Sequence, residues 1–583
     1  MLRLLSFLKT IKKPVAAAMI FAVVSQLGSL VLPLMMSSII NNGIANGDIE
    51  YIKKMGLGMM AVSALAVIIA CFNSYYSSKT ATFYGRNLRR EIFLKVESLS
   101  QRDIDVVGTP SLITRCTNDV KVLQDFVLMG LRMIISAPIM LVGGVVMAFF
   151  MNPKLASIIF GVLPIIAVIV LIVLKVVMPL FRRRQKLIDS INRFIREKLS
   201  GIRVIRAFNR TEHEDERFNK QNIELSSLTL KFQRLMSVLI PVCIVIIIAA
   251  LDLLIVFAAK NLDKMDAVLQ REELLSAIGN LQAFVIYMIM IVFSVTMAAA
   301  MFVIVPRAKI SARRITEVLD LEPSIVEPEN PKSVDENKKG TVEFRNVTFR
   351  YGDGEDPILS DISFTAEKNK VTAIIGCTGS GKSSLVHLIP RFYDVDEGQV
   401  LFDGVDVREL SQKDLHSRIG YIPQKAFLFS GSIEDNLRYG DSNATEEELE
   451  KALSVAQCEF VAHLEDGMKS FVSQNATNFS GGQKQRLSIA RALARKAEVY
   501  IFDDSFSALD FKTDAALRKA IKENITATVI IVAQRVGTIL DADKIIVLEG
   551  GKIVGCGKHS ELIESCDVYK EIYSSQITEE VTQ

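Results

Sequence analysis

The sequence predicts a helical membrane domain with six spans, fused to an α/β domain built on a parallel sheet. Apolar stretches of about 20 residues or more, the length needed to cross a bilayer, recur up to about residue 306. Residues 321–340 are rich in proline and charge, which is typical of a linker. Beyond them, short apolar strands alternate with helical patterns, as in a parallel α/β sheet.

The six expected spans are the apolar stretches of the first half. They lie near residues 15–40, 55–80, 128–151, 155–180, 236–260 and 275–305. The first is too long for a signal peptide, and no small-residue cleavage site follows it. We therefore expect a membrane domain over residues 1–320, a linker over 321–340 and a second domain over 341–583.

Charges in the loops give the expected orientation. Lys and Arg cluster after the second span, within residues 86–95, and after the fourth span, within residues 182–186. Such clusters mark the cytoplasmic side, so both termini are expected to be cytoplasmic in a multi-pass protein of the cell membrane. The net charge of +3 argues against nucleic acid as a partner. The seven cysteines are scattered and suggest neither a zinc site nor a disulfide framework.

A glycine-rich loop between a strand and a helix predicts a phosphate site. In "VTAIIGCTGSGKSSL" an apolar strand precedes the loop and a helix follows it, the context that a phosphate-binding loop needs. The helix N-terminus favours negative charge. Lys382 is expected to reach the β- and γ-phosphates, and the Ser383 hydroxyl is expected to ligate Mg²⁺. The nucleotide-binding residues expected here are Gly376, Thr378, Gly379, Ser380, Gly381, Lys382, Ser383 and Ser384.

Two aspartates follow a later apolar strand, in "VYIFDDSFSALD", residues 499–510. Asp503 ends this strand and is the expected carboxylate for Mg²⁺. It would either bind the ion directly or hold one of the ligands of the ion. Asp504 lies where a hydrolytic site would need a general base whose side chain is long enough to reach the reacting water. Its side chain is one methylene shorter than that of a glutamate.

A second anion site is predicted at "NFSGGQKQR", residues 478–486, where a Ser-Gly-Gly turn opens an amphipathic helix. One chain rarely needs two phosphate cradles for one nucleotide. The economical explanation is that the second cradle serves a nucleotide bound to another subunit. Its residues are Ser480, Gly481, Gly482 and Gln483.

The order of the motifs resembles that of ATP-binding cassette (ABC) transporters. "GCTGSGKSS", "YIPQ", "NFSGGQKQR", "VYIFDDSFSALD" and "IVAQR" follow one another as in the nucleotide-binding domain of that family. The preceding half is similar to the six-helix membrane domain of bacterial ABC exporters. The resemblance implies a type I ABC exporter membrane domain fused to an α/β P-loop ATP-binding cassette domain, with ATP and Mg²⁺ as cofactors.

The resemblance also implies roles for single residues. Tyr351 matches the aromatic residue that stacks on adenine, although by itself it would be taken for an aromatic residue on an edge strand. Gln424 matches the glutamine that senses Mg²⁺ and the membrane domain, and Asp510 matches the aspartate that lies across the dimer. The residues implied for the metal are Ser383, Gln424 and Asp503.

Three positions depart from the family pattern. Asp504 replaces the catalytic glutamate, Gln534 replaces the switch histidine, and Gln474 replaces an acidic residue before the signature. Two changes in one catalytic site suggest that it binds ATP without fast hydrolysis. A base displaced by about 1 Å can lose a hundredfold in rate, and glutamine cannot carry the charge of a histidine.

Because the signature itself is intact, we expect a heterodimer with a different half-transporter, whose competent site this signature completes. The expected activity is that of an ATP-driven exporter working by alternating access. It would move an amphipathic or hydrophobic compound (a drug, lipid or peptide) out of the cytoplasm. One alternative is an exporter that is a homodimer with two slow sites. The other is an ATP-gated channel or a regulatory subunit that does not pump.

Clues to the substrate lie in the fifth and sixth spans. A flexible Met and Phe surface can bind varied apolar compounds, and helix packing or lipid contact is the alternative explanation of the same pattern. Asp252 lies inside the fifth span, where a carboxylate is a functional candidate, for example toward cations, or makes a hydrogen bond between helices. The residues at helical spacing in the sixth span are Ile286, Met290, Phe293, Met297 and Met301. The substrate candidates are Asp252, Met290, Phe293 and Met297.

Overall fold

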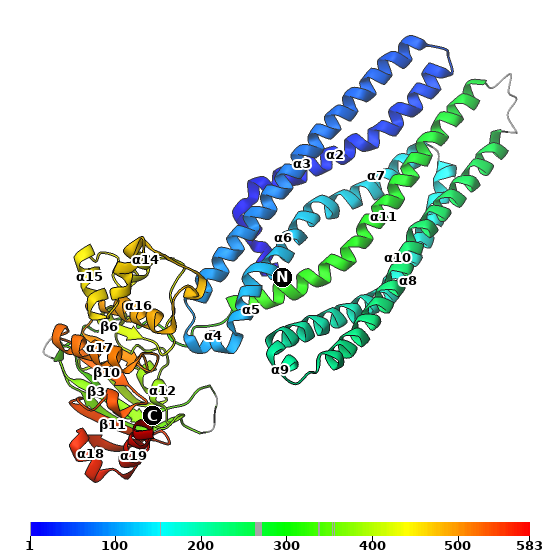
Figure 1. Cartoon of the computed structure of the whole chain (residues 1–583). Coiled ribbons are helices and arrows are strands. Elements are labelled where there is room, and N and C mark those ends of the chain that lie inside the picture. The colour runs from blue at the N-terminus through cyan, green and yellow to red at the C-terminus, as the bar shows by residue number, and fades with distance from the viewer. Residues whose placement is uncertain are drawn as a thin grey trace. The chain divides into compact units, whose positions relative to one another are not determined.

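The computed structural model describes residues 2–151, 153–262, 271–335, 338–352, 354 and 356–582. The chain divides into two compact units. The first unit comprises Met1–Glu97 and Pro110–Leu321, and the second comprises Ser98–Thr109 and Glu322–Gln583 (Figure 1). A short segment from the first half of the sequence therefore belongs to the second unit.

The first unit is built from helices (Figure 1). They are α1 (Leu2–Leu5), α2 (Lys12–Ser38), α3 (Ile49–Glu97), α5 (Thr109–Thr114), α6 (Val120–Met129), α7 (Ile135–Met151), α8 (Pro153–Ser200), α9 (Ile202–Ala207), α10 (Thr211–Leu262) and α11 (Arg271–Leu319). The four longest, α3, α8, α10 and α11, have 48 to 52 residues. At 1.5 Å per residue each is about 70–80 Å long, more than twice the hydrocarbon thickness of about 30 Å, so each extends beyond a membrane.

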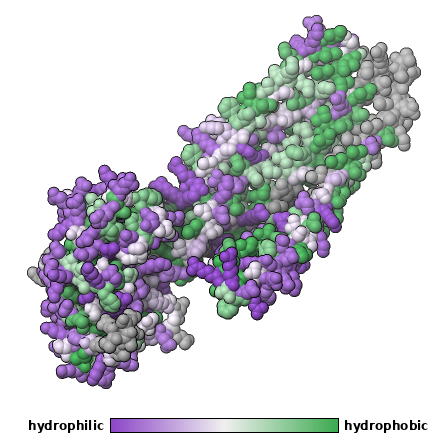
Figure 2. Space-filling model, in the orientation of Figure 1, coloured by the Kyte–Doolittle hydropathy of each residue, from purple (hydrophilic) through white to green (hydrophobic). Residues whose placement is uncertain are grey.

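Four helical segments of the described chain are long and apolar enough to cross a membrane. They are Arg3–Ile44, Ile49–Glu97, Thr109–Met151 and Ile278–Ala298. The two other predicted spans, near residues 155–180 and 236–260, lie in α8 and α10, where many side chains fall outside the described part of the structure. In Figure 2 hydrophobic residues gather on the long helices, whereas the visible face of the second unit is largely hydrophilic.

Helix α11 packs against α2 and α7 through one buried face. The Tyr287 side chain is buried, and its hydroxyl donates to the backbone oxygen of Leu30 at 2.7 Å. On α7, a Cβ atom at Gly144 would lie 2.8 Å from Ile291. The missing side chain therefore lets α7 and α11 approach closely, as small residues do between membrane helices.

A six-stranded sheet forms the centre of the second unit, in the order β12–β11–β3–β10–β9–β6. Neighbouring strands are parallel except for the antiparallel edge strand β12. The strands are β3 (Val371–Gly376), β6 (Ile419–Ile422), β9 (Val499–Asp503), β10 (Thr528–Val532), β11 (Lys544–Glu549) and β12 (Lys552–Gly557). Strands β9 and β10 are buried along their whole length, as their unbroken apolar sequences require. The carboxyl ends of β3, β10 and β9 meet at one edge, where ligand sites form in parallel sheets.

Smaller sheets and helices complete the second unit. A four-stranded sheet has the order β2–β1–β4–β5, and β7 pairs with β8. These strands are β1 (Val342–Phe349), β2 (Leu359–Ala366), β4 (Glu397–Phe402), β5 (Val405–Asp406), β7 (Gly431–Ser432) and β8 (Phe471–Val472). The helices are α12 (Lys382–His387), α13 (Gln412–Arg418), α14 (Ile433–Arg438), α15 (Glu446–Val455), α16 (Gly481–Leu493), α17 (Phe511–Asn524), α18 (His559–Ser565) and α19 (Asp567–Thr582). The predicted fold class, a helical membrane domain fused to an α/β domain, is confirmed.

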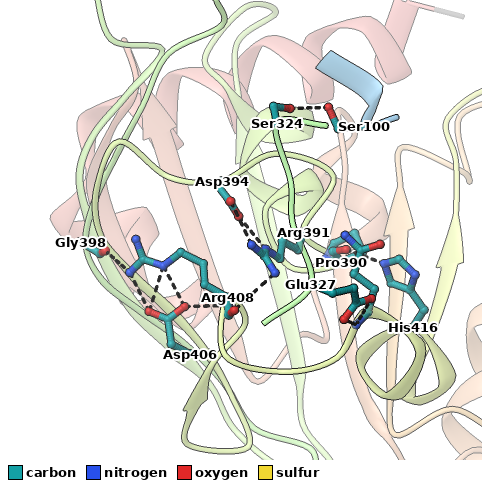
Figure 3. Close-up of polar contacts among 11 residues, drawn as sticks. Ser100, Ser324, Glu327, Pro390, Arg391, Asp394, Gly398, Asp406, Arg408 and His416 are labelled. Carbon is teal, nitrogen blue, oxygen red and sulfur yellow. Dashed lines mark hydrogen bonds and ion pairs between the residues drawn. The ribbon is translucent and has the colours of Figure 1, made fainter. Parts of the chain in front are cut away.

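Helix α4 (Gln101–Val107) is the segment of the first half that belongs to the second unit. Asp103 Oδ2 accepts hydrogen bonds from the backbone N–H groups of Ser100 and Ser324, each at 3.0 Å. The hydroxyls of these two serines lie 2.6 Å apart (Figure 3). Further along α4, Asp105 accepts from the Tyr393 hydroxyl at 3.2 Å. Polar contacts therefore fix α4 to the second unit at two places.

The segment after α11 is also bound to the second unit. The Glu327 carboxylate accepts from the backbone N–H of Gln412 at 3.1 and 3.2 Å, at the start of α13. Lys332 forms an ion pair with Glu409 at 2.8 Å. Figure 3 shows Glu327 on this segment as it runs past α13. These contacts seat the segment on the surface of the second unit.

Candidate nucleotide site

The phosphate-binding loop connects β3 to α12. Gly379 and Gly381 have φ angles of 85° and 93°, which glycine adopts without the steric cost of a Cβ atom. A Cβ atom at Gly376 would lie 2.1 Å from the backbone oxygen of Leu548, so only glycine fits there. Thr378 is exposed at the tip of the loop. The loop therefore has the open, strongly curved backbone that surrounds a phosphate group.

Lys382 lies at the base of the loop. Its side chain is 8% exposed, and Nζ donates to the backbone oxygens of Gly376 and Cys377 at 2.7 and 2.8 Å. Burial lowers the pKa of the ammonium group, and the charges of Asp504 and Asp503 oppose that shift. Ammonium donors directed into a curved loop suit the phosphate chain of a nucleotide.

The Ser380 hydroxyl tests whether the loop fits a phosphate. Its Oγ is buried and has no hydrogen-bond partner among the residues that the structure describes. A buried hydroxyl without a partner costs free energy unless something binds it. A phosphate oxygen beside the loop would satisfy this donor, so the residues present fit a nucleotide.

Ser383 and Asp503 supply the oxygen atoms expected for Mg²⁺. The Ser383 hydroxyl donates to Asp503 Oδ1 at 2.8 Å, so α12 and the end of β9 bring the two groups together. Hydroxyl and carboxylate oxygens are the ligands that this hard cation takes, together with water and substrate phosphates. Gln424, the third predicted metal residue, makes its hydrogen bond to Asp504 instead.

Asp504 accepts hydrogen bonds from two glutamine side chains. Its Oδ2 accepts from Gln424 Nε2 at 2.9 Å and from Gln534 Nε2 at 2.7 Å. The three residues come from separate loops, which follow β6, β9 and β10. Asp504 itself has a left-handed φ of 48°, and its backbone N–H donates to Val532 at 3.0 Å. Two of the three positions that depart from the family pattern, Asp504 and Gln534, are thus in direct contact.

This arrangement restricts what the Asp504 carboxylate can do. The pKa of Asp504 is raised, mainly because its side chain is partly buried, and the charge of Asp503 adds to this shift. The hydrogen bond from Gln424 and the charge of Lys382 oppose it. The carboxylate therefore keeps its affinity for a proton. However, the two amide donors occupy the lone pairs of Oδ2, and a shorter side chain reaches less far.

Tyr351 lies just beyond the end of β1 and beside α12. Its hydroxyl donates to Ser384 Oγ at 3.1 Å, and its ring meets Phe349 and Tyr393 edge to face. The side chain is 40% exposed, and burial of the rest raises its pKa. An aromatic face next to the phosphate-binding helix is available to a flat base.

The second predicted anion site is the beginning of α16. Ser480 is the N-cap residue, and its hydroxyl accepts from the Gln483 backbone N–H at 3.3 Å. In return, the Ser480 backbone N–H donates to Gln483 Oε1 at 2.9 Å, completing a capping box. A Cβ atom at Gly481 would meet nothing within 4 Å, and Gly482 is part-exposed. The 13-residue helix therefore presents an open N-terminus.

Asp510 and Gln474 have local roles that the sequence did not indicate. Asp510 caps α17, because its Oδ1 accepts from the Thr513 backbone N–H at 3.0 Å. That hydrogen bond is the largest cause of its lowered pKa. Gln474 begins the 3-10 turn Gln474–Ala476 before α16.

Two residues of the site, Tyr421 and His387, were not predicted from the sequence. The Tyr421 hydroxyl donates to Asp503 Oδ2 at 3.4 Å, and His387 Nε2 lies 3.0 Å from the same hydroxyl. Helical spacing could have found His387, because it lies four residues after Ser383 and on the same face of α12. Tyr421 opens the motif "YIPQ" and could have been included with Gln424.

The substrate candidates lie on two helices. Asp252 is on α10 with an exposed side chain. Met290, Phe293 and Met297 lie on α11, where Phe293 is 59% exposed and the two methionines are part-buried. Ile286 and Met301 are also part-buried. Phe293 therefore points away from the packed face of α11 that carries Tyr287.

Comparisons with known proteins agree with this arrangement. The family model "ABC transporter transmembrane region" matches residues 15–266, and the model "ABC transporter" matches residues 359–507. An ABC transporter ATP-binding protein of Mycobacterium tuberculosis is 41% identical over 569 residues, which cover 97% of this chain and 96% of that protein. The ABC transporter ATP-binding protein YfiB of Bacillus subtilis is 34% identical over 581 residues, which cover 100% and 99%. A solved structure of a bacterial Atm1-family ABC exporter with ATP bound has the same fold, with a TM-score of 0.80 at 22% identity over 97% of this chain and 99% of that chain.

Proposed function

This chain belongs to the ABC transporter family as an exporter half-transporter, and we propose that it is the ATP-holding, slowly hydrolysing half of a heterodimer. Its membrane domain and its nucleotide-binding domain are fused in one chain, so it is an ATP-hydrolysing transporter of the exporter type. Its own nucleotide site would hold ATP, and the site that its signature completes on the partner would hydrolyse ATP.

The paired hydrogen bonds to Asp504 are the observation that carries the proposal. A catalytic base must be free to take a proton from water and must reach it. Here Gln424 and Gln534 both donate to Oδ2, and the side chain is one methylene short of a glutamate. A misplacement of about 1 Å can cost a hundredfold in rate. The site would then bind ATP and release it slowly rather than hydrolyse it.

The chain's own residues are suited to binding. Lys382 and the Ser380 hydroxyl would hold the phosphates, and Tyr351 would stack on the adenine. Ser383 and Asp503 would hold Mg²⁺, which would neutralise phosphate charge when bound. Tyr421, fixed by His387, would orient Asp503 from the other side. None of these contacts requires Asp504 to act as a base.

The intact signature supports a partner with a competent site. The open N-terminus of α16 offers backbone N–H groups and a favourable dipole to an anion. Since the chain's own phosphate-binding loop follows β3, a second cradle at Ser480–Gly482 is best explained by a nucleotide held on another chain. The partner is then a different half-transporter that retains its catalytic glutamate.

Transport would follow alternating access in the cell membrane, with both termini in the cytoplasm. The contacts of α4 with Ser324 and Tyr393 give the second unit a segment that is continuous with α3. Closure of the nucleotide-binding domains would act on the membrane helices through this segment. The exposed Phe293 and the part-buried methionines of α11 fit an amphipathic or hydrophobic compound, and lipid would surround the helices.

Site-specific variants test the proposal. In the purified complex, changing the partner's catalytic glutamate to Gln should abolish most ATP turnover. Asp504→Asn, which keeps the size of the side chain, should cost far less, and this chain alone should hydrolyse ATP weakly or not at all. Equal losses from the two changes would contradict the asymmetry and favour two equivalent slow sites.

A further inference from the structure

Helix α19 places one amide side chain next to the nucleotide site. Tyr569 is buried, and Ile572 and Tyr573 pack against the main core of the second unit. Spacings of three and four residues put these side chains on one face of the helix. Gln576 is the next residue on that face. The anchored apolar face therefore fixes where the Gln576 amide lies.

The Gln576 amide binds the backbone on both sides of Arg535. Its Nε2 donates to the backbone oxygen of Gln534 at 2.8 Å, and its Oε1 accepts from the backbone N–H of Val536 at 2.7 Å. These two peptide groups lie in the loop that follows β10, and α19 packs against the turn Val536–Thr538. Both distances are short for amide hydrogen bonds, so one side chain holds this loop at two points.

Holding this loop determines one contact at the nucleotide site and one beside it. The side chain of Gln534 donates to Asp504 Oδ2 at 2.7 Å. The guanidinium of Arg535 lies 5.0 Å from the centre of the Phe511 ring, at the first residue of α17. That distance permits a cation–π interaction. A shift of the loop would change both contacts together.

We infer that Gln576 is a positioning residue for the nucleotide site, acting through Gln534 on Asp504. The inference rests on the proposed function in taking Asp504 as the residue that faces the nucleotide. It goes beyond that proposal by assigning control of the site to α19. The amide of Gln576 keeps Gln534 in place as a donor, and so keeps its hydrogen bond to Oδ2 of Asp504.

A double-mutant cycle tests whether Gln576 acts through Gln534. The dissociation rate of a fluorescent ATP analogue would be measured on the full chain in nanodiscs. Gln576→Ala should raise this rate roughly threefold to tenfold, the range that the loss of net hydrogen-bond free energy corresponds to. In a Gln534→Ala background the same change should have little effect, because coupled residues are non-additive. Equal effects in both backgrounds, or no effect in either, would overturn the inference.

Amide hydrogen exchange measures the contact itself and separates it from a loosened helix. In Gln576→Ala the Val536 amide should exchange roughly threefold to tenfold faster. Gln576→Glu keeps an acceptor for this N–H and should stay near the wild-type rate. Ser575→Ala is the matched control, because its hydroxyl donates within α19, to the backbone oxygen of Ile572. An unchanged Val536 rate in Gln576→Ala would contradict the inference. Neither measurement depends on whether this site hydrolyses slowly or the partner is a different chain, so each can fail independently of the proposed function.

Discussion

Lengthening Asp504 and removing one of its amide donors should turn this nucleotide site into a hydrolytic one. The carboxylate is one methylene short, and its Oδ2 accepts from Gln424 at 2.9 Å and from Gln534 at 2.7 Å. The perturbation is the double variant Asp504→Glu with Gln534→His. It restores reach and replaces one amide with a side chain that can carry a proton.

The expected gain follows from two terms. A hydrogen bond to a charged group contributes about 1.5–3 kcal/mol, and about 1.4 kcal/mol is tenfold in rate, so removing one amide is worth roughly tenfold to a hundredfold. Correcting a misplacement of about 1 Å is worth roughly a hundredfold. Both terms act on the same carboxylate and overlap. We expect at least roughly a hundredfold for the double variant, and a smaller gain for Asp504→Glu alone, because both amides stay in place.

The assay is ATP turnover by the purified complex in nanodiscs. The partner's catalytic glutamate is changed to Gln, so that the turnover measured comes from this chain's site. Gln534→His alone is the matched control, because it removes one of the two amide donors without lengthening the side chain. A double variant no faster than the unmodified chain would refute the reasoning that reach and the two amides limit hydrolysis.

Three further outcomes are expected. Lys382→Ala should weaken ATP binding to this chain and lower transport, because it removes the cation facing the β- and γ-phosphates; unchanged occupancy in a direct binding measurement would contradict this. If Asp252 contacts cationic substrates, Asp252→Asn should impair their export and spare neutral compounds in a transport panel at matched expression; a uniform effect would refute that role. Burial, with Glu498 adding to it, raises the pKa of Asp403 to about 7, so the folded chain keeps a proton that the unfolded chain has lost above about pH 4. The stability measured by thermal unfolding should then fall as the pH rises from about 4 to about 7. Asp403→Asn should remove this part of the dependence, and an unchanged profile would contradict it.

Local motifs carried most of what could be predicted. The phosphate-binding loop is contiguous in sequence, and its glycines are required by the backbone at Gly376, Gly379 and Gly381. Unbroken apolar runs predicted the buried strands, and the end of such a run placed Asp503 at the edge of the sheet. Helical periodicity and apolar length likewise predicted the long membrane helices.

Contacts between distant loops could not be predicted in the same way. Gln424, Asp504 and Gln534 were each singled out, but nothing in the sequence says that two amides meet one carboxylate oxygen. That meeting depends on the order β10–β9–β6 in the sheet. Gln576 belongs to no motif, and its position depends on how α19 packs. The attachment of α4 to the second unit depends on Ser324 and Tyr393, residues far away in the chain.

The most direct test of the account is a change in the signature, at the start of α16, which leaves this chain's own phosphate-binding loop before α12 unaltered. Gly482→Asp would place negative charge at the N-terminus of α16, against the phosphate that the signature is proposed to cover. ATP turnover by the complex should collapse as completely as it does when the partner's catalytic glutamate is changed to Gln, while photo-labelling of this chain by an ATP analogue persists. Turnover near the wild-type rate in Gly482→Asp would mean that the signature does not serve the partner, and would contradict the asymmetric heterodimer.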